Sequence, residues 1–400
     1  MDFNTKKRAL IIVGAGASIE YGIPATAAFG KLIEDHLAND EYCRIQGGYD
    51  AYCKIKSKLE SYYAPHSNEA HFERIYHVLH ELAAMHVTEG AVPKFKPILN
   101  EFVKPNYSIS ISALRAACRS TLEAIYKICS ERSEHPNLPL YELKDFLKKL
   151  SNNFTPRIYS TNYDTFFEQA WPGLFTGFTN QLAPGIFSFS PSDYLKDWDQ
   201  PGIFHLHGSV HLGFPHLGRD IGELAWFEST KEAIRHSSFS GSGINRMDGT
   251  TIDRSAVLTG LDKLGRIQEK PFSFYYAGLG AELTEADLIL VIGSGLGDLH
   301  LNNWLRDART QNPNTPLVYV SYWPDAFSLY NNYNFDPTDQ TISMFHDLKI
   351  NFSNLRASDF CNVESWTVDE NSRSAVWSGG FSSFLSSEHF DAVLRRIEVF

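Results

Sequence analysis

Two short stretches of the sequence carry side chains suited to moving a proton and to holding a polar ligand. His205 and His207 stand two positions apart in 203–208 (IFHLHG), and imidazole takes up and releases protons near neutral pH. Asn162 lies in 161–164 (TNYD), and its amide can donate and accept hydrogen bonds at the same time. Two histidines at this spacing could instead bind a metal ion, and an asparagine after a strand is commonly a turn residue or a helix cap.

A third stretch has the small residues that a phosphate-binding turn needs. An apolar run at 10–13, typical of a strand buried on both faces, ends in Gly14, Ala15, Gly16, Ala17 and Ser18. A helix starting near Ser18 would direct its positive end toward an anion. The third glycine of the usual dinucleotide-binding fingerprint is replaced by Ile19, so a plain strand–turn–helix explains this stretch about as well.

Similar apolar runs precede the other candidate site residues, which indicates a common site. Runs around 158–160, 203–206 and 288–292 each end in a turn of small or polar residues. In an open parallel α/β sheet, ligands bind beyond the carboxyl ends of the strands. The residues expected to converge there are Gly14, Ala15, Gly16, Thr161, Asn162, Asp164, His207, Gly208, Gly293 and Ser294.

This series of motifs resembles the sirtuin superfamily. The family pattern is a GAG-x-S loop followed by GIP, a T-x-N-x-D-type motif, a catalytic HG pair and a late G-[ST] turn. This chain has GAGAS at 14–18, GIP at 22–24, HG at 207–208 and GS at 293–294, whereas 161–164 lacks the residue between Thr and Asn. The resemblance implies an α/β fold with a Rossmann-like parallel sheet of the sirtuin type, a helical insertion and no zinc module.

The resemblance also implies roles for particular residues. His207 would be the catalytic base, and Asn162 would hold the ribose hydroxyls and the attacking water. His205 is expected to be structural, and three residues of a late motif are expected to cap a helix: Asp298, His300 and Asn302. The residues expected to bind NAD are Gly14, Ala15, Gly16, Ala17, Ser18, Pro24, Thr161, Asp164, Gly293 and Ser294.

Two departures from the family pattern favour hydrolysis over deacylation. Deacylating sirtuins carry a zinc module with two C-x-x-C pairs, and none of the five cysteines here stands in such a pair. They also continue GIP with Asp-Phe-Arg, where 25–27 reads Ala-Thr-Ala. We therefore expect an NAD glycohydrolase that releases nicotinamide and ADP-ribose without a metal. The alternatives are a non-catalytic module that senses NAD or ADP-ribose, and a protein deacylase or ADP-ribosyltransferase.

Composition and charge limit the partners that the chain can have. A net charge of −11 argues against direct binding to nucleic acid or to an anionic membrane. The sequence shows neither a signal-peptide pattern at its start nor an apolar run of membrane-spanning length, so we expect a cytoplasmic protein. The proteins it most resembles deplete NAD in antiphage abortive infection. That resemblance implies a restrained homo-oligomer with a protein partner such as a HerA-type ATPase or DNA translocase.

Helical periodicity suggests how these motifs are spaced along the chain. Apolar residues at 72, 75, 76, 79, 82 and 83 form one stripe, and 141–150 repeats the pattern. We expect a nucleotide-binding domain at 1–34 and 152–330, a helical insertion at 35–151, and a C-terminal extension at 331–400 packed on the core. Glu73 lies in the insertion, where similar proteins often have an acidic residue. A strand at 316–321 is expected at the sheet edge.

Overall fold

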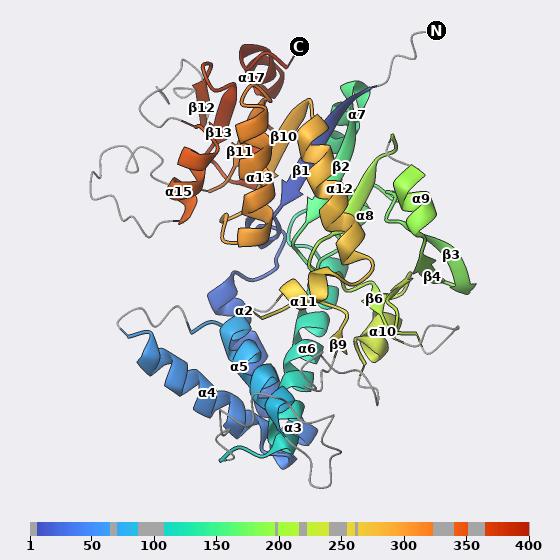
Figure 1. The fold of residues 1–400 in the computed structure, drawn as a ribbon, viewed down its shortest axis with the longest axis vertical. Helices are drawn as coiled ribbons and strands as arrows, with labels where there is room; N and C mark the ends of the chain where they lie inside the picture. Colours follow the sequence, from blue (N-terminus) through green and yellow to red (C-terminus); the bar gives the residue numbers. More distant parts are fainter. Residues whose placement is uncertain are drawn as a thin grey trace.

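The centre of the molecule is a seven-stranded sheet (Figure 1). The computed structural model describes residues 6–64, 70–86, 108–196, 199–215, 222–239, 254–260, 263–322, 340–350 and 365–399. The sheet contains β1 (Lys7–Val13), β2 (Phe154–Ser160), β5 (Gly202–His205), β10 (Leu288–Ile292), β11 (Leu317–Val320), β12 (Trp366–Asp369) and β13 (Ser374–Trp377). Their order is β12-β13-β11-β10-β1-β2-β5, and only the edge pair β12–β13 is antiparallel. The predicted parallel α/β sheet is confirmed.

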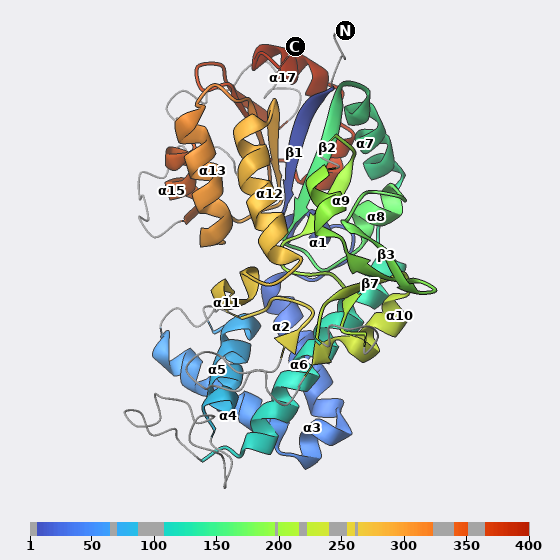
Figure 2. The ribbon, with the colours of Figure 1, turned by 45° about the vertical axis from the view of Figure 1, so that its right-hand side comes forward.

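Helices cover both faces of the sheet, which is why its central strands are continuous apolar runs. One face packs against α12 (Phe272–Glu285), α13 (Leu299–Gln311) and α15 (Gln340–Asp347). The other packs against α7 (Tyr141–Asn153), α8 (Phe166–Ala170), α16 (Phe381–Leu385) and α17 (Phe390–Arg396). Figure 2 shows β1 and β2 between α12 and α13 on one side and α7 and α8 on the other. Neighbours in β1 such as Ile11 and Ile12 face opposite cores, and both are fully buried.

The chain reverses its direction of travel across the sheet between β1 and β10. From β1 it proceeds to β2 and β5 on one side, and from β10 it proceeds to β11 and β13 on the other. The carboxyl ends of β1 and β10 therefore border the switch point at which open α/β sheets bind ligands. The prediction that 316–321 forms an edge strand is wrong, because β13 pairs with the far side of β11 and β12 closes that edge.

Five helices between β1 and β2 pack mainly on one another. They are α2 (Thr26–Asn39), α3 (Glu41–Ile45), α4 (Gly48–Tyr62), α5 (Phe72–Met85) and α6 (Ile111–Glu134). In Figure 1 they lie beyond the carboxyl end of β1, at the opposite end of the molecule from the termini. The stripe predicted on α5 is confirmed, since Phe72, Ile75, Tyr76, Leu79 and Ala83 are buried. This helical part is therefore placed where it can reach the switch point.

Short elements surround the end of β5. A four-stranded antiparallel sheet combines β3 (Phe178–Ala183), β4 (Ile186–Phe189), β7 (Ala225–Phe227) and β6 (Leu212–Gly213), and β8 (Ser238–Phe239) pairs with β9 (Arg254–Ser255). The remaining helices are α1 (Gly16–Ile19), α9 (Pro191–Lys196), α10 (Thr230–Ala233), η4 (Ile234–His236) and α11 (Leu264–Ile267). Among the helices that are described, none has both the length and the apolar character needed to cross a bilayer.

Part of the predicted C-terminal extension, 331–339 and 351–364, lies outside the described residues. The described part adds β12 and β13 to the sheet and is held by the buried side chain of Arg309 on α13. This guanidinium donates to the carbonyl oxygens of Leu348 at 3.1 Å and Ser372 at 3.0 Å. The amphipathic pattern predicted at 390–397 forms α17, with Val393 and Leu394 buried.

Candidate functional site

The loops that follow β1 and β10 pack against each other backbone to backbone. The Gly14 N–H donates to the last carbonyl of β10 at 2.9 Å, and the Gly16 N–H donates to the carbonyl of Gly293 at 2.7 Å. A Cβ atom on Gly293, whose φ is +62°, would lie 2.0 Å from the Ala17 nitrogen. One on Gly14 would lie 2.6 Å from the Cα atom of Ser294. The glycines therefore let two of the predicted ligand loops meet at the switch point.

Most N–H groups of the loop after β1 already donate to protein carbonyls. Besides Gly14 and Gly16, Ala17 donates to the Gly14 carbonyl at 3.1 Å and Ser18 to the Ala15 carbonyl at 3.0 Å. The helix predicted near Ser18 begins at Gly16 and contains four residues, so its dipole is weak. A pyrophosphate in this loop would have to share or replace these bonds, and its binding there stays a prediction.

Asn162 ties the turn after β2 to the loop after β1. Its Nδ2 donates to the Gly14 carbonyl at 2.9 Å and to Ser18 Oγ at 2.7 Å. Ser18 Oγ donates in turn to Asp164 Oδ2 at 2.6 Å. All three side chains are buried, with Asn162 only 8% exposed. Because both amide protons are committed, the Oδ1 atom is the part of this amide that is left to accept a hydrogen bond from a ligand.

The carboxyl group of Asp164 is perturbed by its position in this network. Burial raises its pKa to about 6, against the Ser18 hydrogen bond, which lowers it. A carboxyl with such a pKa is partly protonated near neutrality. Asp164 therefore orders the turn, as predicted from its place after the strand, and holds Ser18 rather than facing solvent.

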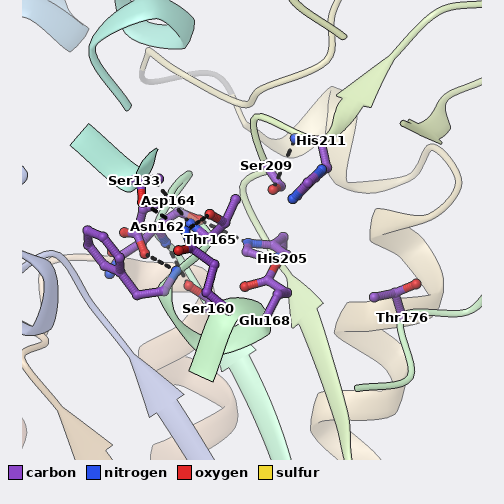
Figure 3. A network of polar contacts seen from close by, with 12 residues as sticks. Ser133, Ser160, Asn162, Asp164, Thr165, Glu168, Thr176, His205, Ser209 and His211 are labelled. Carbon is purple, nitrogen blue, oxygen red and sulfur yellow. Dashed lines mark hydrogen bonds and ion pairs between the residues drawn. The ribbon is translucent and has the colours of Figure 1, made fainter. Parts of the chain in front are cut away.

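His205 lies behind Asn162 and is held on both ring nitrogens. Nδ1 lies 3.0 Å from the Asn162 carbonyl oxygen, and Nε2 lies 2.6 Å from Oε1 of Glu168 on α8. Figure 3 shows His205 beside Glu168, with Asn162 and Asp164 next to them. Two acceptors require two N–H donors, so the ring is an imidazolium. Burial alone would lower the pKa of His205, but Glu168 outweighs it and raises that pKa.

His207 stands just beyond β5 and faces the opposite side of the switch point. Strand β5 ends at His205, so the alternation predicted over 203–207 stops before His207. Nε2 of His207 lies 2.7 Å from Oδ2 of Asp298, which precedes α13. The two atoms form an ion pair only when the ring is protonated, and the angle at Nε2 falls outside the range of a hydrogen bond. His207 is 6% exposed, and its carbonyl accepts from the Leu258 N–H at 2.7 Å.

Burial and a nearby lysine keep the His207 ring neutral. Burial lowers its pKa most, Lys263 lowers it further, and Asp298 and Glu73 oppose this without reversing it. Burial also raises the pKa of Asp298, but His207 and Lys263 outweigh that effect and hold it well below its usual range. Lys263 Nζ lies 3.8 Å from a carboxylate oxygen of Glu73 on α5, so the helical part of the molecule contributes charge to the site.

The other predicted residues lie around this network. The Thr161 N–H donates to the Val13 carbonyl at 2.9 Å, which extends the β1–β2 ladder into the turn. Pro24 is half-buried between α1 and α2, and its neighbour Ile23 donates to the Ser18 carbonyl at 3.1 Å. Hydrogen bonds thus join the predicted residues of the β1, β2 and β10 loops, while His207 reaches the β10 loop through Asp298.

Sequence reasoning missed Glu168 as a site residue, and it missed the contact of Asp298 with His207. The predicted capping role of Asp298 is confirmed, because Oδ1 accepts from the N–H groups of His300 at 3.0 Å and Leu301 at 3.3 Å. The spacing of 293–298 signals a cap, but it does not reveal that the second oxygen faces His207. Glu168 belongs to a short helix, and its approach to His205 follows from packing that the sequence pattern does not contain.

The two histidines do not form part of a metal cluster in the described residues. There, no group of three or more His, Cys, Asp or Glu side chains is arranged to hold a metal ion. His211, which is close in sequence, uses Nδ1 on the Phe227 carbonyl oxygen at 2.7 Å and stacks on Trp226. His216 lies outside the described residues.

Comparison with known proteins links part of the chain to one family. The sequence model of the SIR2-like domain matches residues 156–338, which is less than half of the chain but includes Asn162, His207 and Asp298. No curated protein matches the sequence. A mutant Sir2 homologue bound to 2′-O-acetyl ADP-ribose aligns with a TM-score of 0.39 and 13% identity over 86% of this chain and 91% of that chain. A Sir2 homologue bound to NAD aligns with a TM-score of 0.38 and 13% identity over 86% and 89%. Scores this low carry no information on the arrangement of the site.

Proposed function

We propose that this protein hydrolyses NAD at the bond between nicotinamide and ribose. The observation that carries the proposal is the pairing of two features at adjacent strand ends. Asn162 after β2 is locked to the loop after β1 through Gly14 and Ser18. His207 after β5 is a buried imidazole with a lowered pKa, ready to accept a proton at neutral pH.

The types of residue at the switch point suit NAD as a ligand. NAD brings a leaving group that already carries positive charge, so its departure as neutral nicotinamide needs no acid. Asn162 would orient water and the ribose through Oδ1, and His207 would take the proton that water loses as its oxygen bonds to the ribose carbon. The loops at 14–18 and 293–294, with Thr161, Asp164 and Pro24 around them, would hold the rest of NAD. The match of residues 156–338 to the SIR2-like domain supports this choice of ligand.

The isolated chain is proposed to be at rest until a partner acts on it. The N–H groups of Gly14, Gly16, Ala17 and Ser18 are directed at protein carbonyls, so a pyrophosphate in this loop would have to share or replace these bonds. A restrained NAD hydrolase suits an effector of antiphage abortive infection, working in the cytoplasm as a homo-oligomer with a HerA-type ATPase. That role rests on the sequence resemblance. The same internal bonds favour, as a second candidate, a module that senses NAD or ADP-ribose without cleaving it.

The proposal is tested by following nicotinamide and ADP-ribose released from NAD by the purified protein. Asn162→Ala and His207→Ala are expected to lose activity about 10²- to 10⁴-fold, as loss of a positioned acid–base group does. His135→Ala removes an exposed histidine at the end of α6 and should leave activity unchanged. Turnover that survives in both site variants would contradict the proposal.

A silent wild-type protein calls for a second measurement. NAD binding by calorimetry, with and without the proposed ATPase partner, separates a resting enzyme from a sensor. The resting enzyme gains turnover when the partner is added. The sensor binds NAD, and its partner responds to NAD even when His207 is replaced by alanine.

A further inference from the structure

We propose that Asp298 is the positioning residue of His207, fixing which imidazole nitrogen keeps its lone pair. The inference rests on the proposed function and names a second residue for its proton transfer. A lone pair on Nε2 would be repelled by the carboxylate oxygen 2.7 Å away, so Nε2 carries the ring proton and Nδ1 is left to receive the proton from water. Among the described residues, no side chain or carbonyl bonds to Nδ1.

The two oxygens of the Asp298 carboxylate make different contacts. Oδ1 caps α13 by accepting from the N–H groups of His300 and Leu301. Oδ2 lies 2.7 Å from His207 Nε2 and has no hydrogen-bond partner among the described residues. A helix cap needs only one side-chain oxygen, so capping alone does not explain where the second oxygen is placed. Because the cap fixes the side chain, Oδ2 cannot turn away from the imidazole without losing the hydrogen bonds to α13.

The loop that carries Asp298 reaches from the end of β10 toward the end of β5. Strands β5 and β10 are separated by β1 and β2, a distance of about 14 Å at the usual strand spacing. The loop holds its shape through Asn302, whose Nδ2 donates to the Leu296 carbonyl at 2.5 Å, and through the Tyr319 hydroxyl, which donates to the Ser294 carbonyl. Leu296 is buried with a φ of +51°, which few non-glycine residues adopt. These contacts fix the conformation of the loop and with it the position of Asp298.

The charges around the pair favour an ionised Asp298 beside a neutral ring. The groups that face His207 are Asp298 from the β10–α13 loop, Lys263 from the segment before α11, and Glu73 from α5. Lys263 stabilises the carboxylate and disfavours an imidazolium, so the ring stays neutral until it takes a proton from the attacking water. Once His207 is protonated, the adjacent carboxylate offsets its charge and stays ionised.

The test is Asp298→Asn, which keeps the capping oxygen and the shape but removes the charge. Its control is Asp307→Asn, an exposed aspartate on the same helix. We expect kcat for NAD to fall about 10²- to 10³-fold with KM within about threefold of the wild-type value, since Asp298 acts through His207 and not on the substrate. The acidic limb of the pH profile should move to lower pH, because the carboxylate favours the protonated ring. Asp307→Asn should change neither quantity.

A histidine NMR titration reads the same contact without turnover. The His207 signal is identified by its loss in His207→Gln, and its pKa should be lower in Asp298→Asn than in the wild type. Asp298→Ser retains a capping hydroxyl but is too short to reach the ring, and it should reproduce both effects. Wild-type kcat with an unshifted His207 pKa would show that Asp298 is a helix cap only. If the wild-type protein does not cleave NAD, the titration still decides the role of Asp298, and only the proposed function fails.

Discussion

His205 and His207 are two residues apart and both are buried, but His205 is charged and His207 is neutral. Both rings are less than a tenth exposed, and each lies within 2.7 Å of one carboxylate oxygen. His205 is aligned with acceptors on both nitrogens, and its pKa is raised because Glu168 outweighs burial. His207 meets Asp298 without hydrogen-bond alignment and has Lys263 nearby, and its pKa is lowered because burial dominates.

The difference shows that the protonation of a buried histidine depends on whether its carboxylate partner outweighs the effect of burial. A ring that is already an imidazolium cannot take a proton from water, so His205 is a structural cation that holds the Asn162 carbonyl. A neutral ring can accept one, so His207 is the only member of the pair suited to general base chemistry.

Removing the carboxylate partner of His205 should destabilise the fold most. Glu168→Ala leaves a buried imidazolium unpaired, and breaking such a pair costs about 3 kcal/mol or more. Urea unfolding of the variant beside Glu131→Ala, an exposed glutamate on α6, measures the loss. An equal free energy of unfolding in the two variants would mean that His205 is not charged in the folded state.

The same pair predicts how that loss depends on pH. The raised pKa of His205 contributes stability that is present below its unfolded value of 6.5 and is lost as pH rises through the higher folded value. The lowered pKa of Glu168 contributes stability that is present above 4.5 and is lost as pH falls through the lower folded value. The gap between wild type and Glu168→Ala should therefore be widest from pH 4.5 to 6.5. A gap that keeps growing above pH 8 would contradict the assignment.

Asp164 tests whether burial sets the charge on the same side of the site. Its folded pKa of about 6 lies above the unfolded value of 3.8, so the folded state binds this proton more tightly and loses stability as pH rises between the two values. Asp164→Asn avoids that loss and should be about 3 kcal/mol more stable than wild type at pH 7.5, with the difference fading below pH 4. Unfolding at both pH values measures it, and a variant less stable at pH 7.5 would contradict the burial effect.

Substitution of Lys263 tests the difference between the two histidines through the pKa of His207, and its expected effect is the smallest. Lys263→Met removes a positive charge that lowers the His207 pKa, so that pKa should rise by less than about one unit while the His205 signal stays in place. Histidine NMR titration measures both rings in one sample. Lys231→Met, at an exposed position on α10, is the matched control. A change in the pKa of His205 comparable to that of His207 would show that Lys263 acts on both rings.

The sequence predicted the site residues that directly follow strands, but not the residues whose contacts depend on packing. Apolar runs buried on both faces predicted the parallel sheet, and parallel strands bring Asn162 and His207 to one edge. The order of the strands could not be predicted, because the strand at 374–377 is short and its pairing with β11 is a long-range choice. The partners Glu168 and Asp298 approach from separate helices, so neither alternation nor spacing could assign them to His205 and His207.

We propose that His207, and not His205, is the base, and the pH dependence of kcat/KM for NAD distinguishes the two histidines. The protein is measured in the state in which it turns over, with its partner if that is required. The account predicts an acidic limb whose pKa lies below 6.5, the ordinary value for histidine, and predicts that this limb disappears in His207→Gln together with most of the activity. A limb above 6.5, or one that persists when His207 is replaced, would contradict the account.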